Sequence, residues 1–320
     1  MLVVVAGGAG FIGSHLCDAL VARGDEVIAV DNLLTGRLQN VAHLNGHERF
    51  SLIEHDITIP IVGADWLDGD VDAVLDLASP ASPDDFATLP LEILAVGSTG
   101  TRNLLDLAYE QGSRFLLAST SEVYGDPLVH PQTEDYLGNV DPVGPRSCYD
   151  EAKRFAEALT VAYRRVRGTD TRIARIFNTY GERMRPDDGR VLTNFIVQAL
   201  AGEPMTLYGD GSQSRSFCYV ADEVAGLLAV LDGDVPGPVN IGNPDERTIR
   251  ETAELVRELT GSTSEIIAVP LPEERLGDPR RRCPDITLAR NRLEWEPTTP
   301  LRLGLQRMID SMRTSGVGAP

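Results

Sequence analysis

A tyrosine and a lysine four residues apart have the types and spacing of a proton-transfer pair. Tyr149 and Lys153 begin a stretch with helical periodicity, and residues four apart share one face of a helix. An ammonium beside a phenol stabilises the phenolate and lowers the pKa of the tyrosine. The pair therefore predicts a base that removes a proton from a substrate hydroxyl. Because this spacing is common on ordinary helices, the prediction depends on other residues that support it.

A hydroxyl and a carboxylate follow a predicted strand and provide that support. The strand Arg114–Ala118 leads directly into Thr120 and Glu122. Ligands bind at the carboxyl ends of strands in open α/β sheets. We expect Thr120 to hold the reacting hydroxyl and Glu122 to polarise a group or to position water. The alternative for Glu122 is a solvated loop acid.

A glycine-rich turn between the first strand and the first helix predicts a dinucleotide site. Val5–Gly13 reads VAGGAGFIG, and such glycines let backbone N–H groups approach a pyrophosphate at the start of a helix. Asp31 ends the second strand, 18 residues after Gly13. An acid there accepts hydrogen bonds from the adenosine ribose and repels a 2′-phosphate, which favours NAD over NADP. The alternative is a tight turn that binds nothing.

Short apolar runs alternate with helical stretches in the first half of the chain, which is typical of a parallel sheet covered on both faces. The sequence predicts a Rossmann-type, doubly wound α/β fold. The expected strands are Leu2–Ala6, Glu26–Val30, Ser51–Ile53, Ala73–Leu77, Arg114–Ala118 and Arg172–Phe177, and the expected helices among them are Phe11–Arg23, Leu91–Gln111 and Tyr149–Arg167.

The alternation of strands and helices ends after Phe177. Loops rich in Gly, Pro and Asp then separate three further helices, Val191–Ala201, Ala221–Leu231 and Thr248–Thr260. We expect residues 1–177 to form an NAD-binding Rossmann domain. Residues 178–312 are expected to form a smaller α/β lobe that binds the substrate, with segments that return to the first domain. Residues 313–320 are expected to be a frayed tail.

Composition and charge limit the partners of the protein. The 320 residues include 29 basic and 48 acidic side chains, for a net charge of −19, which argues against nucleic acid or an anionic membrane surface. No apolar run approaches the roughly 18–20 residues of a membrane span, and the N-terminus lacks the features of a signal peptide. The four cysteines are far apart, so we expect free thiols in a reducing cytoplasm and no metal site.

Longer strings of residues resemble one group of nucleotide-sugar enzymes. The glycine turn, Thr120 and the Tyr149/Lys153 pair are similar to the extended short-chain dehydrogenase/reductase family. Within it, the resemblance to the UDP-glucuronate decarboxylases, or UDP-xylose synthases, covers nearly the whole chain. The strings are Leu77–Pro83 (LASPASP), Leu116–Pro127 (LLASTSEVYGDP), Gly144–Arg154 (GPRSCYDEAKR), Ala174–Gly181 (ARIFNTYG), Asp188–Val191 (DGRV), Asn194–Leu200 (NFIVQAL), Asn240–Pro244 (NIGNP) and Pro284–Ile286 (PDI).

The resemblance implies conversion of UDP-glucuronate to UDP-xylose with a tightly bound, recycled NAD. Oxidation at C4, with Tyr149 as the base, produces a ketone β to the C6 carboxylate, CO₂ is lost, and the 4-ketopentose is reduced again. It implies the catalytic residues Thr120, Glu122, Tyr149 and Lys153. It places the substrate against Thr120, Asn178, Asn194, Tyr208, Arg215 and Arg282, with the two arginines on the diphosphate and Tyr208 at the uracil.

The resemblance also implies a cofactor site and a homodimer. The dimer contact is expected on the helices of the Leu91–Gln111 and Tyr149–Arg167 regions. The implied cofactor-binding residues are Gly7, Gly10, Phe11, Ile12, Asp31, Asn32, Thr35, Gly36, Arg37, Asp56, Ile57, Leu77, Ala78, Ser79, Ala118, Tyr149 and Lys153.

Three departures from the decarboxylase pattern leave alternatives open. Ala95, Val96 and Gly97 stand where the family usually has Lys-Thr-Asn, and that lysine is expected near the substrate carboxylate. Asp76 replaces a usual His, and Ala6 replaces a usual Thr. A UDP-glucuronate 4-epimerase, a 4,6-dehydratase or another nucleotide-sugar 4-epimerase, and a binding protein without turnover are the alternatives. The usual acid of a dehydratase is absent at Ser121, and a binder is disfavoured by the intact catalytic set. The pathway served and the release of a 4-keto product are left open.

Overall fold

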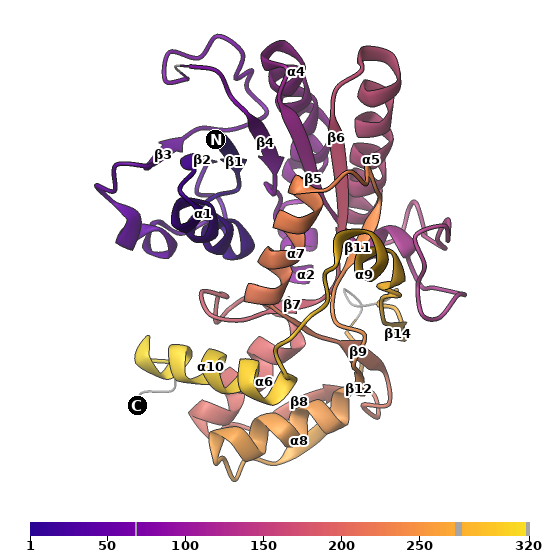
Figure 1. Ribbon diagram of the computed structural model, residues 1–320. Coiled ribbons are helices and arrows are strands. Elements are labelled where there is room, and N and C mark those ends of the chain that lie inside the picture. Colours follow the sequence, from indigo (N-terminus) through magenta and orange to yellow (C-terminus); the bar gives the residue numbers. More distant parts are fainter. Residues whose placement is uncertain (68, 273–276, 318–320) are drawn as a thin grey trace.

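A parallel sheet of seven strands forms the centre of the computed structural model, which describes residues 1–67, 69–272 and 277–317 (Figure 1). The strand order is β11-β6-β5-β4-β1-β2-β3, and every neighbouring pair is parallel. This confirms the predicted parallel sheet. The order reverses at β1, which lies between β2 and β4, and such a switch point is where open α/β sheets bind ligands. The strands are β1 (Leu2–Ala6), β2 (Glu26–Asp31), β3 (Phe50–Glu54), β4 (Ala73–Asp76), β5 (Arg114–Thr120), β6 (Thr171–Ile176) and β11 (Val239–Ile241).

Helices cover both faces of this sheet because successive side chains of a strand point to opposite faces. Val3 and Val5 pack in one buried cluster with α1 (Phe11–Arg23) and α7 (Val220–Asp232). Val4 packs in a second cluster with α4 (Thr101–Gln111) and α5 (Ser147–Arg167). The doubly wound arrangement therefore follows from the all-apolar strand, which is buried on both sides.

The segment Leu91–Gln111 is helical throughout, as predicted, but its middle residues form a π turn that the sequence analysis did not predict. After α2 (Pro83–Thr88), the chain forms α3 (Pro90–Ala95), a π-helical turn η3 (Val96–Gly100) and then α4. A π turn inserts one extra residue into a helix and often lies near a functional site. Its position follows from packing against α5, because a Cβ on Gly97 would lie 2.8 Å from the Cβ of Ala152.

The remaining elements lie mostly on the substrate side of the sheet, with α6, α8 and α10 grouped below it in Figure 1. They form three small sheets, β10-β7, β12-β9-β14 and β13-β8. None of the described helices is long and apolar enough to cross a membrane. The bounds are η1 (Leu38–Asn40), η2 (Ala42–Leu44), η4 (Ser121–Tyr124), β7 (Thr179–Tyr180), α6 (Val191–Ala201), β8 (Met205–Tyr208), β9 (Ser214–Ser216), β10 (Cys218–Tyr219), β12 (Glu246–Thr248), α8 (Ile249–Thr260), β13 (Ile266–Val269), β14 (Arg281–Arg282), α9 (Thr287–Leu293) and α10 (Leu301–Thr314).

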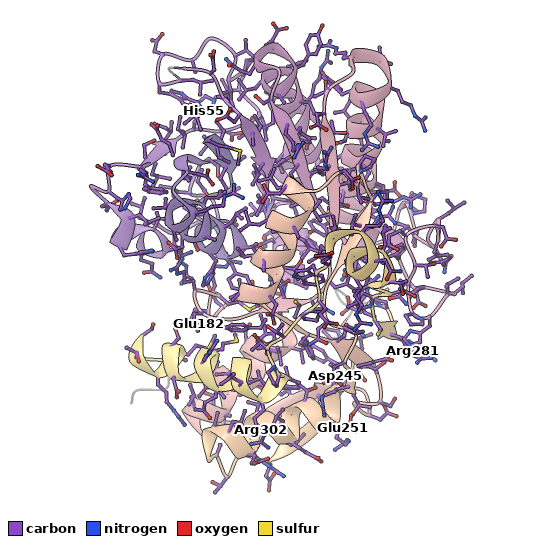
Figure 2. All side chains as sticks on the ribbon, in the orientation of Figure 1. His55, Glu182, Asp245, Glu251, Arg281 and Arg302 are labelled. Atoms are coloured by element: carbon purple, nitrogen blue, oxygen red, sulfur yellow. The ribbon has the colours of Figure 1, made fainter. Side chains whose placement is uncertain are left out.

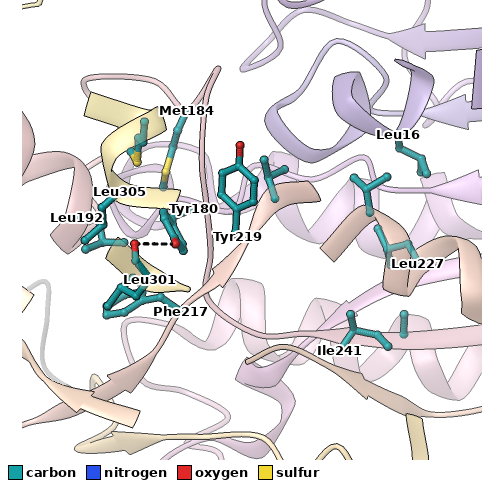
Figure 3. Close-up of a cluster of buried hydrophobic side chains, with 14 of the residues drawn as sticks. Leu16, Tyr180, Met184, Leu192, Phe217, Tyr219, Leu227, Ile241, Leu301 and Leu305 are labelled. Atoms are coloured by element: carbon teal, nitrogen blue, oxygen red, sulfur yellow. Dashed lines mark hydrogen bonds between the residues drawn. The ribbon is translucent and has the colours of Figure 1, made fainter. Parts of the chain in front are cut away.

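One buried cluster joins these elements to the main sheet (Figure 3). It runs from Leu16 of α1 and Leu227 of α7 to Leu305 of α10. At its centre, the buried Tyr180 donates a hydrogen bond from its hydroxyl to the carbonyl of Leu301, at 3.2 Å. The elements on the two sides of the cavity described below therefore share a continuous apolar core.

The side chain of Glu182 lies at the level between the main sheet and α10 (Figure 2). Its carboxylate accepts a hydrogen bond from the Tyr219 hydroxyl at 2.8 Å, and its backbone carbonyl lies 3.0 Å from the ring Nε2 of His15 on α1. Polar contacts thus accompany the apolar core where the main sheet and its helices meet the elements that follow β7.

Candidate active site

A single cavity brings together most of the residues predicted from the sequence. It lies at the carboxyl ends of the central strands, between the glycine turn, the start of α5 and the loop 181–190. The predicted residues in its wall are Gly7, Gly10, Phe11, Ile12, Thr35, Leu77, Ser79, Ala118, Thr120, Glu122, Tyr149, Lys153, Asn178, Asn194, Tyr208 and Arg215. The predicted residues outside its wall are Asp31, Asn32, Gly36, Arg37, Asp56, Ile57, Ala78 and Arg282.

The glycine turn is shaped for close approach of a ligand to the backbone. Gly7 has a positive φ of 79°, and a Cβ there would lie 2.8 Å from the backbone of Leu77. A Cβ on Gly13 would lie 2.0 Å from the carbonyl oxygen of Gly7. Helix α1 begins after Gly10 without a side-chain cap, and its first residues line the cavity. A pyrophosphate fits this exposed helix start, as a dinucleotide requires.

Asp31 is held rigidly next to the turn. Its carboxylate accepts hydrogen bonds from the N–H groups of Ala9 at 3.0 Å and Leu33 at 2.9 Å. Burial raises the pKa of Asp31, and these two hydrogen bonds oppose that shift. A Cβ on Gly36 would lie 2.6 Å from the carboxylate, so the loop after β2 needs glycine there. The geometry fits the ribose-binding role predicted for Asp31.

Tyr149 and Lys153 project from the first turns of α5 into the cavity. The Tyr149 ring stacks on Phe86, with 4.9 Å between ring centroids. The Lys153 ammonium lies 6.0 Å from the centroid of the Tyr149 ring and donates to the carbonyl of Ala118 at 3.0 Å. Burial raises the pKa of Tyr149 to about 12, although a hydrogen bond with Thr120 acts in the opposite direction. The depressed pKa that we expected from the helical spacing is therefore outweighed by burial.

The sequence contains a further signal at Lys153 that motif reading does not use. Its 29 basic residues are 28 arginines and one lysine, and that lysine is Lys153. Arginine is bulkier, stays charged at every physiological pH and donates in a fixed fork, whereas lysine is compact and shifts its pKa when buried. Lysine thus stands at this one basic position, and arginine stands at the other 28.

Glu122 lies within a cluster of buried arginines. Its Oε2 accepts hydrogen bonds from Arg146 at 2.6 Å and from Arg282 at 2.9 Å. Burial alone would raise the pKa of Glu122, but the charges of Arg282, Arg146 and Arg215 lower it to about 2. Glu122 is therefore a carboxylate at neutral pH, and the solvated loop acid considered above does not describe it. Arg146, which also pairs with Asp278, is a cavity residue that the sequence analysis missed.

The loop 181–190 contributes three arginines to the cavity wall, and two of them, Arg185 and Arg190, contact the segment 81–85. Arg185 pairs with Asp85 at 3.3 Å. Arg190 donates to the carbonyl of Ala81 at 2.6 Å, and its charge lowers the pKa of Tyr149. Neither residue was singled out by sequence, although Arg190 lies in one of the strings that carry the resemblance. Arg190 therefore places positive charge near Tyr149.

Comparisons with known proteins agree with this geometry. A model of the "NAD dependent epimerase/dehydratase family" matches residues 3–242. The chain is 52% identical over 307 residues to UDP-glucuronic acid decarboxylase 1 of Danio rerio, covering 96% of this chain and 71% of that protein. It is 52% identical over 314 residues to UDP-glucuronic acid decarboxylase 5 of Arabidopsis thaliana, covering 98% and 89%. The solved UDP-glucuronic acid 4-epimerase of Bacillus cereus, in complex with UDP-glucuronic acid and NAD, is similar with a TM-score of 0.87 and 28% identity, covering 98% of this chain and all of that one.

Proposed function

The chain belongs to the NAD dependent epimerase/dehydratase family, and from this premise we propose that it decarboxylates UDP-glucuronate to UDP-xylose. The observation that carries the proposal is the juxtaposition of Thr120, Tyr149 and Lys153 with the arginine-bound Glu122 in one cavity. The identity of 52% to decarboxylases over nearly the whole chain supports it.

The glycine turn, Asp31 and Lys153 would hold the cofactor. NAD, when bound, supplies the oxidising group that accepts a hydride from sugar C4 and later returns it. Tyr149 accepts the proton of the C4 hydroxyl, while Thr120 hydrogen-bonds to the same oxygen and fixes its position. We propose that the Lys153 ammonium stabilises the tyrosinate formed in this step.

Loss of CO₂ follows from the chemistry of the oxidised sugar. The C4 ketone is β to the C6 carboxylate, so the C5–C6 bond breaks and its electron pair moves into the carbonyl as an enolate. Protonation at C5 gives the 4-ketopentose, which is reduced at C4. We propose that Glu122, held as a carboxylate by Arg146 and Arg282, positions the water that provides the proton at C5.

The substrate carboxylate needs a positive partner other than the family's usual lysine. Ala95, Val96 and Gly97 do not line the cavity, and Gly97 packs on Ala152 instead. Arg190 is the cation on the cavity wall whose charge acts on Tyr149, next to which C4 must lie. We therefore propose that Arg190 binds the carboxylate of the substrate.

For the nucleotide, Asn178, Asn194, Tyr208 and Arg215 lie in the cavity wall and are proposed to contact UDP. Arg215 is largely enclosed and donates to the Ser214 carbonyl at 2.8 Å, which leaves part of its guanidinium facing the cavity. Arg282 lies behind Glu122 and is proposed to act by holding that carboxylate.

UDP-glucuronate 4-epimerisation is the second candidate, and the replaced Lys-Thr-Asn positions favour it. The two reactions share the first oxidation and differ in whether CO₂ leaves. Mass spectrometry of UDP-glucuronate incubated with the protein and sub-stoichiometric NAD⁺ separates them. Loss of one CO₂ from the intact nucleotide supports decarboxylation, and chromatography then distinguishes UDP-xylose from a 4-keto product. An isomer of unchanged mass would establish epimerisation, and no reaction would contradict both.

We also propose a homodimer formed through α3, α4 and α5. Apolar side chains are exposed along this surface, including Leu91, Phe155 and Val166. Light scattering at micromolar concentration tests this, and a monodisperse monomer would contradict it. The division at residue 177 and a cytoplasmic location are further proposals. The location is supported by four cysteines that are all free and buried, and cell fractionation tests it.

A further inference from the structure

Asp76 is a buried carboxylate next to the proposed catalytic lysine. It is the last residue of β4, and only 1% of it is exposed. In the sheet it pairs with Leu117 of β5, and the next residue, Ala118, accepts the hydrogen bond of Lys153. Asp76 therefore ends β4 beside the part of β5 to which the Lys153 ammonium is bonded.

The two oxygens of Asp76 have different surroundings. Oδ2 accepts a hydrogen bond from the Thr101 hydroxyl at 2.8 Å. Oδ1 is buried and has no hydrogen-bond partner of ordinary geometry within the described ranges, although the Ala78 N–H also stabilises the carboxylate. A buried carboxylate is costly unless a charge compensates it, and Lys153 is the cation that acts on it.

The π turn η3 assembles this arrangement. It ends at Gly100, so that Thr101 opens α4 with its hydroxyl on Asp76. At its other end, Gly97 packs against Ala152, the residue before Lys153. Two positions that depart from the decarboxylase pattern thus bear on this lysine, since the Lys153 charge acts on Asp76 and Gly97 packs against the residue before Lys153.

We propose that Asp76, fixed by Thr101, is the counter-ion that keeps Lys153 in its ammonium form, and is therefore a positioning residue that acts through Lys153 on Tyr149. The inference rests on the proposed function for the roles of Lys153 and Tyr149.

The charges around the pair agree with this role. Burial lowers the pKa of Lys153 and raises that of Asp76, and the attraction between the two opposes both shifts. The other groups near the phenol, Arg190 and Glu122, act on Tyr149. Asp150, one turn before Lys153 along α5, also acts on Tyr149.

The single lysine makes a direct test possible. Growth on [¹³C]lysine labels one side chain, so the Cε resonance of Lys153 can be followed against pH in the NAD-loaded protein. In Asp76→Asn, we expect the midpoint of this titration to move to lower pH by about one unit or more, as loss of a nearby opposite charge requires. An unchanged midpoint would overturn the proposal, whatever the protein's substrate.

Kinetics separate the proposal from the proposed function. With UDP-glucuronate as substrate, the alkaline limb of kcat should move to lower pH in Asp76→Asn, while KM changes less than about twofold because Asp76 makes no substrate contact. If wild type does not act on UDP-glucuronate, the proposed function fails and the lysine titration still decides the role of Asp76. A loss of kcat without any shift of the lysine midpoint would make Asp76 purely structural.

A second variant and a matched control complete the design. Thr101→Val leaves the charge of Asp76 in place but removes its hydrogen bond, and a smaller shift in the same direction is expected; a folded variant without a shift would contradict the proposal. The control is Asp106→Asn, which replaces an aspartate of α4 by asparagine, as Asp76→Asn does in β4. Asp106 contacts Tyr163, which is about 15 Å further along α5 than Lys153. The lysine midpoint should not move in this control, and an equal shift there would show that the effect is not specific to Asp76.

Discussion

Two buried glutamates show how differently this protein treats charge in its interior. Glu122, beside the cavity, is paired with two arginines, and its pKa is about 2. Glu223, in the first turn of α7, is completely buried, and neither carboxyl oxygen has a hydrogen-bond partner of ordinary geometry in the described ranges. Burial raises the pKa of Glu223 well above its usual value, with Cys218 and Thr179 as its polar neighbours. The interior therefore holds a glutamate as an anion where guanidinium groups surround it and as a neutral acid where they do not.

The largest effect is expected on the cavity side, at Tyr149. Tyr149→Phe removes the proposed base and should lower kcat by about 10²–10⁴-fold. The ring and its stacking on Phe86 are retained, so the Tm should change little. Chromatography of the UDP-sugars measures turnover, and calorimetry measures the Tm. Turnover close to that of wild type would remove Tyr149 from the reaction.

Glu122→Gln tests the charged glutamate by removing its ion pairs. Arg146 and Arg282 would be left buried without their carboxylate, and we expect a loss of about 3 kcal/mol in the free energy of unfolding at pH 7. Because the folded pKa of Glu122 is lowered, its stabilisation is present above the usual glutamate range and is lost as pH falls toward 2. Urea unfolding at pH 7 and pH 4 should therefore show a smaller deficit at pH 4. An equal deficit at both values would argue against the ion pairs.

Glu223→Leu tests the neutral glutamate, and its expected effect on the free energy of unfolding is opposite to that of Glu122→Gln. Replacing a buried acid by an apolar side chain should raise the free energy of unfolding by about 1–2 kcal/mol and leave turnover unchanged. In wild type, the folded state keeps a proton that the unfolded state releases, so stability falls as pH rises above the usual glutamate range. The gain should therefore be larger at pH 8 than at pH 5.

Glu223→Gln is the matched control for that substitution. It keeps the shape and polarity of the side chain but cannot ionise, so the pH dependence should flatten without the full gain in stability. Thermal unfolding at pH 5 and pH 8 measures both variants. A stability that does not depend on pH in wild type would show that Glu223 does not titrate as described.

The smallest effect is expected on the surface, at Arg302 of α10 (Figure 2). Arg302 pairs with Glu258 at 2.8 Å, and more than half of each side chain is exposed. Arg302→Ala should change the Tm by less than about 1 °C, since water screens such pairs. A loss as large as that of Glu122→Gln would mean that burial does not explain the difference between the two glutamates.

Local pattern was enough to predict the scaffold. Leu2–Ala6 and Phe11–Arg23 have the predicted bounds, because a buried parallel strand is apolar throughout and a glycine turn marks the helix start. The spacing of Tyr149 and Lys153, the proposed catalytic pair, depends only on helical periodicity. These features are contained in short stretches of sequence.

Contacts between distant segments were not predictable in this way. The π turn at Val96–Gly100 arises where Gly97 meets α5, and the sequence of this segment reads as an ordinary α-helix. Arg146 reaches Glu122 and Asp278 across 24 and 132 residues of chain. Strands of two or three residues, such as β7 and β14, are too short to leave a periodic signal.

The presence of one lysine, itself buried, has a practical consequence for coupling chemistry. Amine-reactive dyes, cross-linkers and activated resins find no lysine on the surface of this protein. Lys153 itself lies on α5 in the cavity wall, and only 5% of it is exposed. Lysine-directed coupling should therefore leave Lys153 unmodified while the protein is folded.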